Sequence, residues 1–183
     1  MTEPFLAAAY KNDMKANGGE KDAYAYFPVA IGQNQDLHIT VAFLPNPTET
    51  QLNALDVLFE TMALVARTER PIATVTRQAF FYDGTDREPE DEETVVPDGA
   101  VPVLVVKMAP LYTFLINQYA KDHLVNKFGN EYPILHITCP IDPVTRSTRT
   151  LEFMTPIGTS IPLTRVALKR KGIKTDMFSV SLY

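Results

Sequence analysis

The chain has 183 residues, of which 45% are hydrophobic and 21% charged, and its formal net charge is −5. This balance is typical of one folded domain and excludes an intrinsically disordered chain. The weakly acidic total also excludes binding to long nucleic acid by charge alone, although it is compatible with a small phosphate ligand.

The sequence predicts neither a membrane span nor a signal peptide, and it has one cysteine. No apolar run approaches ~18 residues and the N-terminus has no basic region, so we expect a cytoplasmic protein without a membrane partner. The single cysteine, Cys139, agrees with a reducing compartment, and we expect it to be a small buried hydrophobic side chain.

The first half of the chain predicts a hairpin followed by a helix. Residues 24–31 are predicted as a strand that Gly32 to Asp36 turns into a second strand. Thr48 and Gln51 then match a capping box at the start of a helix. This helix carries an apolar stripe formed by Leu52, Leu55, Leu58, Phe59, Met62 and Val65.

The second half predicts further strands around a second long helix that begins at Pro110. We expect this helix to end at Gly129 and to face inward through Leu111, Phe114, Leu115, Tyr119, Leu124 and Phe128. The predicted strands are residues 72–82, 101–108, the run around His136, 162–171, and an edge strand at 177–183.

An acidic segment interrupts the pattern. Between Asp83 and Asp98 there are eight acids and one base, Arg87, which gives a local charge of −7 and leaves +2 for the remaining chain. With two prolines and little apolar content, residues from about 83 to 99 are predicted as a solvated, mobile loop. A divalent-metal site is the alternative, although Glu90 to Glu93 lack the alternating ligand spacing of a calcium loop.

The tetrapeptide Leu-His-Ile-Thr occurs twice, at residues 37–40 and 135–138, and the two copies hold two of the three histidines. Each copy lies in an apolar run that predicts a strand. Strand alternation places the histidine and threonine of each copy on one face, about 6 to 7 Å apart. The opposite faces are expected to carry Leu37, Ile39, Val41 and Phe43 in the first copy and Leu135, Ile137, Cys139 and Ile141 in the second.

Two such imidazoles on opposite walls of one cleft can act as a general base and a general acid in the same step. This pairing suits phosphodiester cleavage, with His38 and His136 as the catalytic residues. The hydroxyls of Thr40 and Thr138 would donate to the non-bridging phosphate oxygens. The expected chemistry uses no metal and no cofactor.

These motifs, His38-Ile39-Thr40 and His136-Ile137-Thr138, resemble those of the 2H phosphoesterases, a family with two His-x-Thr motifs. The likeness runs from about Tyr24 to Lys171. It implies an α+β fold in which residues 1–183 form a single bilobal, pseudo-twofold domain, with two antiparallel sheets lining a central cleft and helices outside. Some relatives place an arginine soon after the second motif, whereas this chain reaches Arg146 only later.

The resemblance also implies a hydrolase that cleaves nucleotide phosphodiesters without metal, with His38 and His136 catalytic and Thr40 and Thr138 binding phosphate. The substrate would be a small nucleotide or, preferably, a cyclic oligonucleotide, as in phage anti-CBASS enzymes that act in the host cytoplasm. Cleavage of 2',3'-cyclic or 2'-5' RNA ends in tRNA processing is the alternative. Candidates for stacking on a base are Tyr10, Tyr24, Tyr26 and Phe27.

Two other classes of protein remain open. A non-catalytic nucleotide-binding module would keep the cleft, although binding alone does not need two intact acid-base motifs. A zinc site on His38 and His136 would need another ligand, which the sequence does not suggest. Arg146 and Arg149 are predicted to lie in a plain surface loop, with presentation of their guanidinium groups to phosphate as the alternative. His123 is expected to be exposed or bridging.

Overall fold

The computed structural model describes residues 5–82, 85–124, 134–173 and 175–183, and these form a mixed α+β structure. The predicted α+β class is therefore confirmed. The helices are α1 (Phe5–Asn17), α2 (Glu49–Val65) and α3 (Pro110–His123). The strands are β1 (Ala23–Ile31), β2 (Asn34–Leu44), β3 (Ile72–Tyr82), β4 (Thr85–Arg87), β5 (Val101–Lys107), β6 (His136–Thr138), β7 (Ser160–Pro162), β8 (Arg165–Arg170) and β9 (Phe178–Ser181).

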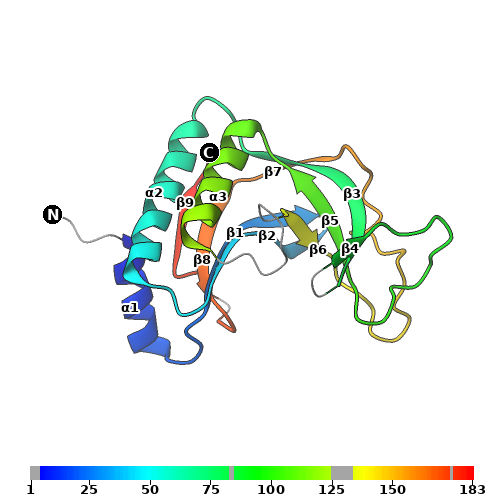
Figure 1. Ribbon diagram of the computed structural model, residues 1–183, viewed down its shortest axis with the longest axis horizontal. Helices are drawn as coiled ribbons and strands as arrows, with labels where there is room; N and C mark the ends of the chain where they lie inside the picture. The colour runs from blue at the N-terminus through cyan, green and yellow to red at the C-terminus, as the bar shows by residue number, and fades with distance from the viewer. Residues whose placement is uncertain (1–4, 83–84, 125–133, 174) are drawn as a thin grey trace.

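The strands form one antiparallel sheet in the order β4-β3-β5-β6-β2-β1-β8-β9, with β7 paired to β3. Figure 1 shows the three helices together beside β1, β8 and β9, while the long loops lie at the other end, around β3 and β4. The strands of the two halves are joined in this one sheet, because β2 and β6 are hydrogen-bonded neighbours.

The predicted hairpin of β1 and β2 is confirmed, but it contains a β-bulge. In the register of this hairpin, Val41 is an extra residue of β2 between Thr40 and Ala42. An extra residue reverses the alternation of faces. As a result Phe43 is 39% exposed and Leu44 is fully buried, so the predicted core position of Phe43 is wrong.

Helix α2 begins as the sequence predicts. The backbone N–H of Gln51 donates to the Thr48 hydroxyl at 3.1 Å, and the backbone N–H of Thr48 donates to the Gln51 side chain at 2.9 Å. This capping box satisfies two backbone donors that the helix itself leaves unpaired. The predicted apolar stripe is buried at Leu52, Leu55, Leu58, Phe59 and Met62.

Helix α3 buries only part of the predicted stripe: Tyr119 is buried and Leu115 and Leu124 pack against the core, as predicted, but Leu111 and Phe114 do not face inward. Leu111 and Phe114 are 44% and 61% exposed, whereas Tyr112, Ile116 and Tyr119 are buried. The two tyrosine hydroxyls donate to backbone carbonyl oxygens near the ends of α2, at 2.6 and 2.9 Å. Tyrosine can be buried when its hydroxyl finds such an acceptor. The predicted Phe128 and the C-cap Gly129 lie outside the described residues.

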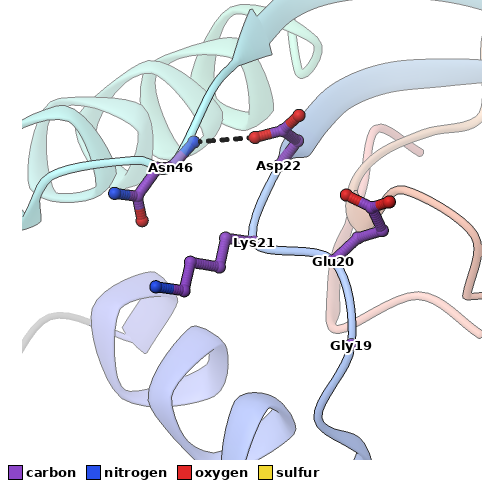
Figure 2. A pocket seen from close by; sticks show the side chains of 5 residues that line it. All are labelled: Gly19, Glu20, Lys21, Asp22 and Asn46. Carbon is purple, nitrogen blue, oxygen red and sulfur yellow. Dashed lines mark hydrogen bonds between the residues drawn. The ribbon is translucent and has the colours of Figure 1, made fainter.

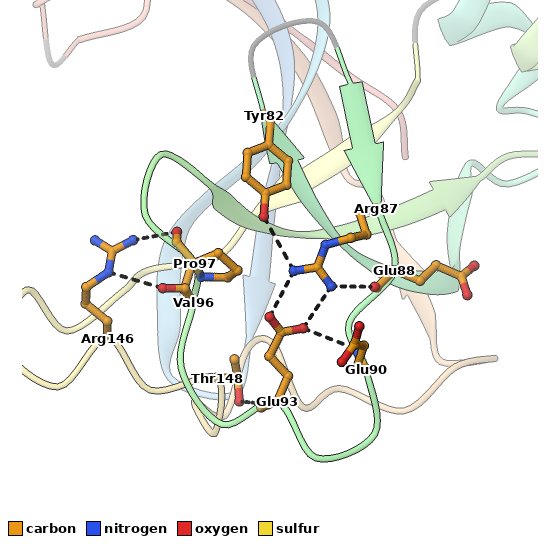
Figure 3. Close-up of polar contacts among 9 residues, drawn as sticks. All are labelled: Tyr82, Arg87, Glu88, Glu90, Glu93, Val96, Pro97, Arg146 and Thr148. Atoms are coloured by element: carbon orange, nitrogen blue, oxygen red, sulfur yellow. Dashed lines mark hydrogen bonds and ion pairs between the residues drawn. The ribbon is translucent and has the colours of Figure 1, made fainter.

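Hydrogen bonds within the described part of the acidic segment, residues 85–99, and to the loop around Arg146 and Thr148 hold it in place (Figure 3). Both terminal nitrogens of Arg87 donate to the Glu93 carboxylate, at 3.0 and 2.9 Å. The Thr148 hydroxyl donates to the backbone carbonyl of Glu93 at 3.0 Å. Within the described ranges, no group of three or more histidine, cysteine or acidic side chains is arranged to hold a metal ion.

Arg146 is part of the same anchor. Its Nε donates to the carbonyl oxygen of Val96 at 3.3 Å and its Nη2 to that of Pro97 at 3.0 Å (Figure 3). The guanidinium therefore fastens one loop to another. Of the two predicted roles of this loop, the structure favours the plain surface loop over phosphate binding for Arg146.

One face of the sheet is covered by the helices and forms the main hydrophobic core. Cys139 lies in this core at 2% exposure, and burial raises the pKa of its thiol to about 12, as expected of a small buried side chain. Arg170 is fully buried on the same side, where its Nε donates to the Asp13 carboxylate and ties β8 to α1. In the described part of the chain, no helix is long and apolar enough to span a membrane.

Candidate functional site

The two His-Ile-Thr motifs lie side by side because β2 and β6 are neighbours. Ile39 pairs with Ile137 in antiparallel register. In such a register the flanking residues meet in reverse order, so the histidine of each motif lies across from the threonine of the other. His38 and His136 are then diagonal neighbours on one face, at the about 7 to 8 Å typical of such pairs.

Burial shows which face of the sheet carries the histidines and threonines of the motifs. Ile39 and Ile137 are both fully buried in the main core. His38 and His136 are partly exposed on the opposite, open face, together with the threonines of the two motifs. Neither threonine hydroxyl has a hydrogen-bond partner among the residues described, so both are available to a ligand. The predicted alternation is thus confirmed within each motif.

The neighbourhood of His38 is aromatic and cationic. The rings of Tyr24 and Tyr26, on β1, each lie 5.7 Å from the imidazole, centroid to centroid. Lys169, on β8, is the cross-strand partner of Tyr24. Burial lowers the pKa of His38, and the nearby positive charges of His136 and Lys169 lower it further.

Tyr26 is held by an ionic network at the edge of the site. Its hydroxyl donates to one oxygen of Asp176, and Arg165 donates to the other oxygen at 2.5 Å. Burial, followed by this hydrogen bond to a carboxylate, raises the pKa of Tyr26. The hydroxyl therefore stays protonated, and the fixed ring defines one wall beside His38.

The neighbourhood of His136 is apolar. The ring of Phe81, on β3, lies 4.7 Å from the imidazole and packs on a small apolar floor of Ala79, Val103 and Val105. The floor belongs to the open face, because Val105 is the cross-strand partner of His136. Few groups here can solvate a charge.

A hydrogen bond fixes the tautomer of His136. Its Nδ1 lies 2.8 Å from the carbonyl oxygen of Ile134. A carbonyl only accepts, so Nδ1 carries the proton, and the neutral ring presents an unprotonated Nε2. Burial lowers the pKa of His136, while the Ile134 carbonyl opposes that shift because it favours the imidazolium.

Other predicted residues lie away from this pair. The Tyr10 hydroxyl donates to the Lys21 carbonyl oxygen at 2.7 Å, and Phe27 is fully buried. His123 lies at the end of α3, with its ring 4.9 Å from that of Tyr119. Of the four predicted aromatic candidates, the structure brings only Tyr24 and Tyr26 to the histidines.

Sequence reasoning missed three groups near the motifs, namely Phe81, Lys169 and Asp176. They come from strands or turns that only the strand order brings close. Strand alternation could have shown which face of β3 carries Phe81 and which face of β8 carries Lys169. The sequence did not show which strands lie next to β3 and β8.

A hollow of about 570 Å³ lies elsewhere, at the start of β1, and is lined by Gly19, Glu20, Lys21, Asp22 and Asn46 (Figure 2). The Asn46 backbone N–H donates to the Asp22 carboxylate across it, at 3.1 Å. Neither histidine lines this hollow, so its size does not mark it as the reactive centre. The open face with the paired motifs remains the candidate site.

Known proteins offer a distant likeness in structure. No family model matches the chain, and no curated protein matches it. Among solved structures, TT0787 of Thermus thermophilus resembles the chain with 20% sequence identity and a TM-score of 0.45, over 100% of this chain and 93% of that one. A likeness at this level assigns neither family nor function.

Proposed function

We propose that the protein is a metal-independent phosphodiesterase of the 2H type, which cleaves a nucleotide phosphodiester by two-histidine acid-base catalysis. The observation that carries the proposal is the antiparallel pair Ile39 and Ile137, because this register makes His38 and His136 diagonal neighbours on one open face. The bilobal, pseudo-twofold arrangement about this pair is part of the proposal.

The surroundings of the two imidazoles suggest their roles. Burial lowers the pKa of both imidazoles, but the charges of His136 and Lys169 lower that of His38 further, whereas the carbonyl of Ile134 opposes the shift at His136. We therefore assign the base to His38 and the acid to His136. Both imidazoles can then reach one phosphate that is bound between the two rings.

The reaction then balances without another reagent. His38 takes the proton from a water or a ribose 2'-hydroxyl as its oxygen bonds to phosphorus. His136 gives its Nε2 proton to the leaving oxygen as the old phosphorus–oxygen bond breaks. The two rings finish with exchanged protonation states, and solvent restores them.

The threonines would stabilise the charge that develops on phosphate. Each hydroxyl lies across from the histidine of the other motif, so a phosphate between the rings also lies between the hydroxyls. Thr40 and Thr138 would donate to the two non-bridging oxygens, where negative charge accumulates in the transition state.

A cyclic oligonucleotide is the substrate that we favour, as in a phage enzyme that removes a host defence signal. Aromatic rings flank the histidines on both sides, with Tyr24 and Tyr26 beside His38 and Phe81 beside His136. Such rings can stack on a base on each side of the scissile phosphate. An RNA-end phosphodiesterase remains the alternative, because it needs a base on one side only.

Turnover of a substrate panel in the presence of EDTA tests the proposal. The panel holds 2',3'-cyclic mononucleotides, 2'-5' dinucleotides, 3',3'-cyclic dinucleotides and cyclic trinucleotides. We expect cleavage of at least one cyclic oligonucleotide that EDTA does not reduce. Loss of turnover with EDTA, restored by a divalent metal, would overturn the mechanism, and tight binding without cleavage would favour the nucleotide-binding module.

A further inference from the structure

Lys169 and Arg170 are adjacent cations on β8 with opposite surroundings. Arg170 is fully buried on the helix-covered face, where Asp13 neutralises it. Lys169 is partly exposed and pairs across strands with Tyr24, whose ring lies against His38. Strand alternation therefore brings Lys169 to the open face that carries the two motifs.

The arginines on that open face are already neutralised. Arg165 pairs with Asp176 at 2.5 Å, and Arg77, in the other half of the sheet, pairs with Asp86 at 2.5 Å. Within the described segments, by contrast, no carboxylate lies within ion-pair distance of Lys169. A partly buried cation without a counter-ion beside a proposed phosphate site can bind a further anion.

The position of Lys169 fits the span of a nucleotide chain. β8 is separated from β2 by β1, which is two strand spacings of about 4.8 Å, and Lys169 aligns with Tyr24 and Phe43, so it lies across the sheet from His38 and toward the Phe43 end of β2. Tyr24 belongs to the intervening strand β1, and its ring lies 5.7 Å from that of His38. A base stacked on this ring would carry its own phosphate toward the lysine.

We propose that Lys169 binds a second phosphate of the substrate, one nucleotide away from the scissile phosphodiester on the His38 side. The preferred substrate is therefore an oligonucleotide with at least two phosphates, linear or cyclic, and not a 2',3'-cyclic mononucleotide. This inference rests on the proposed function, since it takes the histidine pair as the site of cleavage.

Two matched substrates separate the second phosphate from all other contacts. ApA has one phosphodiester and two adenines, whereas 3',3'-cyclic di-AMP has the same bases and two phosphodiesters. We expect Lys169→Met to lower the ratio of kcat/KM for cyclic di-AMP to kcat/KM for ApA by about 10- to 100-fold, as loss of a charge-assisted hydrogen bond predicts, because any effect through the pKa of His38 is common to both substrates. The salt dependence of kcat/KM should also fall by about one counter-ion.

Two control variants accompany this measurement. Lys121→Met removes the same charge from the exposed side of α3 and should change neither substrate. Lys169→Arg keeps the charge and should retain most of the activity on cyclic di-AMP. Equal losses on both substrates, or no loss on cyclic di-AMP, would overturn the second-phosphate role.

Binding to a variant without the catalytic pair distinguishes this inference from the proposed function. In the His38→Ala, His136→Ala double variant, adding Lys169→Met should weaken binding of cyclic di-AMP about tenfold or more in calorimetry and leave ApA unaffected. Lys169-dependent binding without turnover in the wild type would support this inference and overturn the proposed function. Turnover of cyclic di-AMP that Lys169→Met leaves unchanged would support the proposed function and overturn this inference.

Discussion

The two walls of the candidate site contain the same motif in different surroundings. The His38 wall has two tyrosines and Lys169, while the His136 wall has Phe81, an apolar floor and one backbone carbonyl. The motif supplies an imidazole and a hydroxyl on each side. In the proposed mechanism, groups on neighbouring strands bias which imidazole acts as the base and which as the acid.

The first prediction breaks each wall in turn. We expect His38→Ala and His136→Ala each to lower kcat by about 10²- to 10⁴-fold, the usual contribution of a general acid or base. Circular dichroism should show an unchanged fold, since both rings lie on the open face. His123→Ala serves as the control and should keep full activity; a comparable loss there would contradict the special role of the pair.

The second prediction concerns the hydroxyl on each wall. Thr40→Val and Thr138→Val keep the shape of the side chain but remove the donor. Each should lower kcat by about 10- to 100-fold with a smaller effect on KM, because a hydrogen bond to a charged group contributes about 1.5 to 3 kcal/mol. Steady-state kinetics on the best substrate of the panel provides the measurement, and a change in KM alone would indicate ground-state binding only.

The third prediction compares the two pKa values directly. Lys169→Met should raise the pKa of His38, because it removes a positive charge that disfavours the imidazolium, and should leave that of His136 nearly unchanged. Titration of the imidazole resonances by NMR reports both rings separately. Equal shifts in the two rings would show that the walls are not electrostatically distinct.

The smallest expected effect is on stability. Burial lowers the pKa of both His38 and His136 in the folded state below the ordinary 6.5. The unfolded chain then binds more protons between these values, so stability is fully present above pH 6.5 and declines as the pH falls through the folded pKa values. Urea unfolding at pH 7.5 and 5.5 should show this decline, and replacing both histidines with asparagine should reduce it.

The elements of the fold were predictable where local chemistry decides them. The capping box of Thr48 and Gln51 and the hairpin of β1 and β2 are confirmed. The burial of individual residues was not predictable where it depends on a β-bulge or on a hydrogen-bond acceptor from another part of the chain. Val41 forms a bulge that reverses the face of Phe43, and α3 turns Tyr112 inward because a carbonyl accepts its hydroxyl.

The site divides in the same way. Alternation along each strand was enough to place histidine and threonine on one face of their motif. The antiparallel register between the motifs pairs residues almost a hundred positions apart in the sequence, so it cannot be predicted from local sequence patterns. Phe81 and Lys169 belong to the site only through the strand order, and Arg87 anchors the acidic segment through a pairing with Glu93 that composition alone does not reveal.

The pH dependence of kcat/KM tests the acid-base pair most directly, with EDTA present throughout. We predict a bell-shaped profile for the wild type with its maximum below pH 6.5, because the pKa of each histidine is lowered in the free protein. In the residual activity, His38→Ala should remove the acidic limb and His136→Ala the basic limb. A bell that persists unchanged in both variants would contradict the two-histidine mechanism.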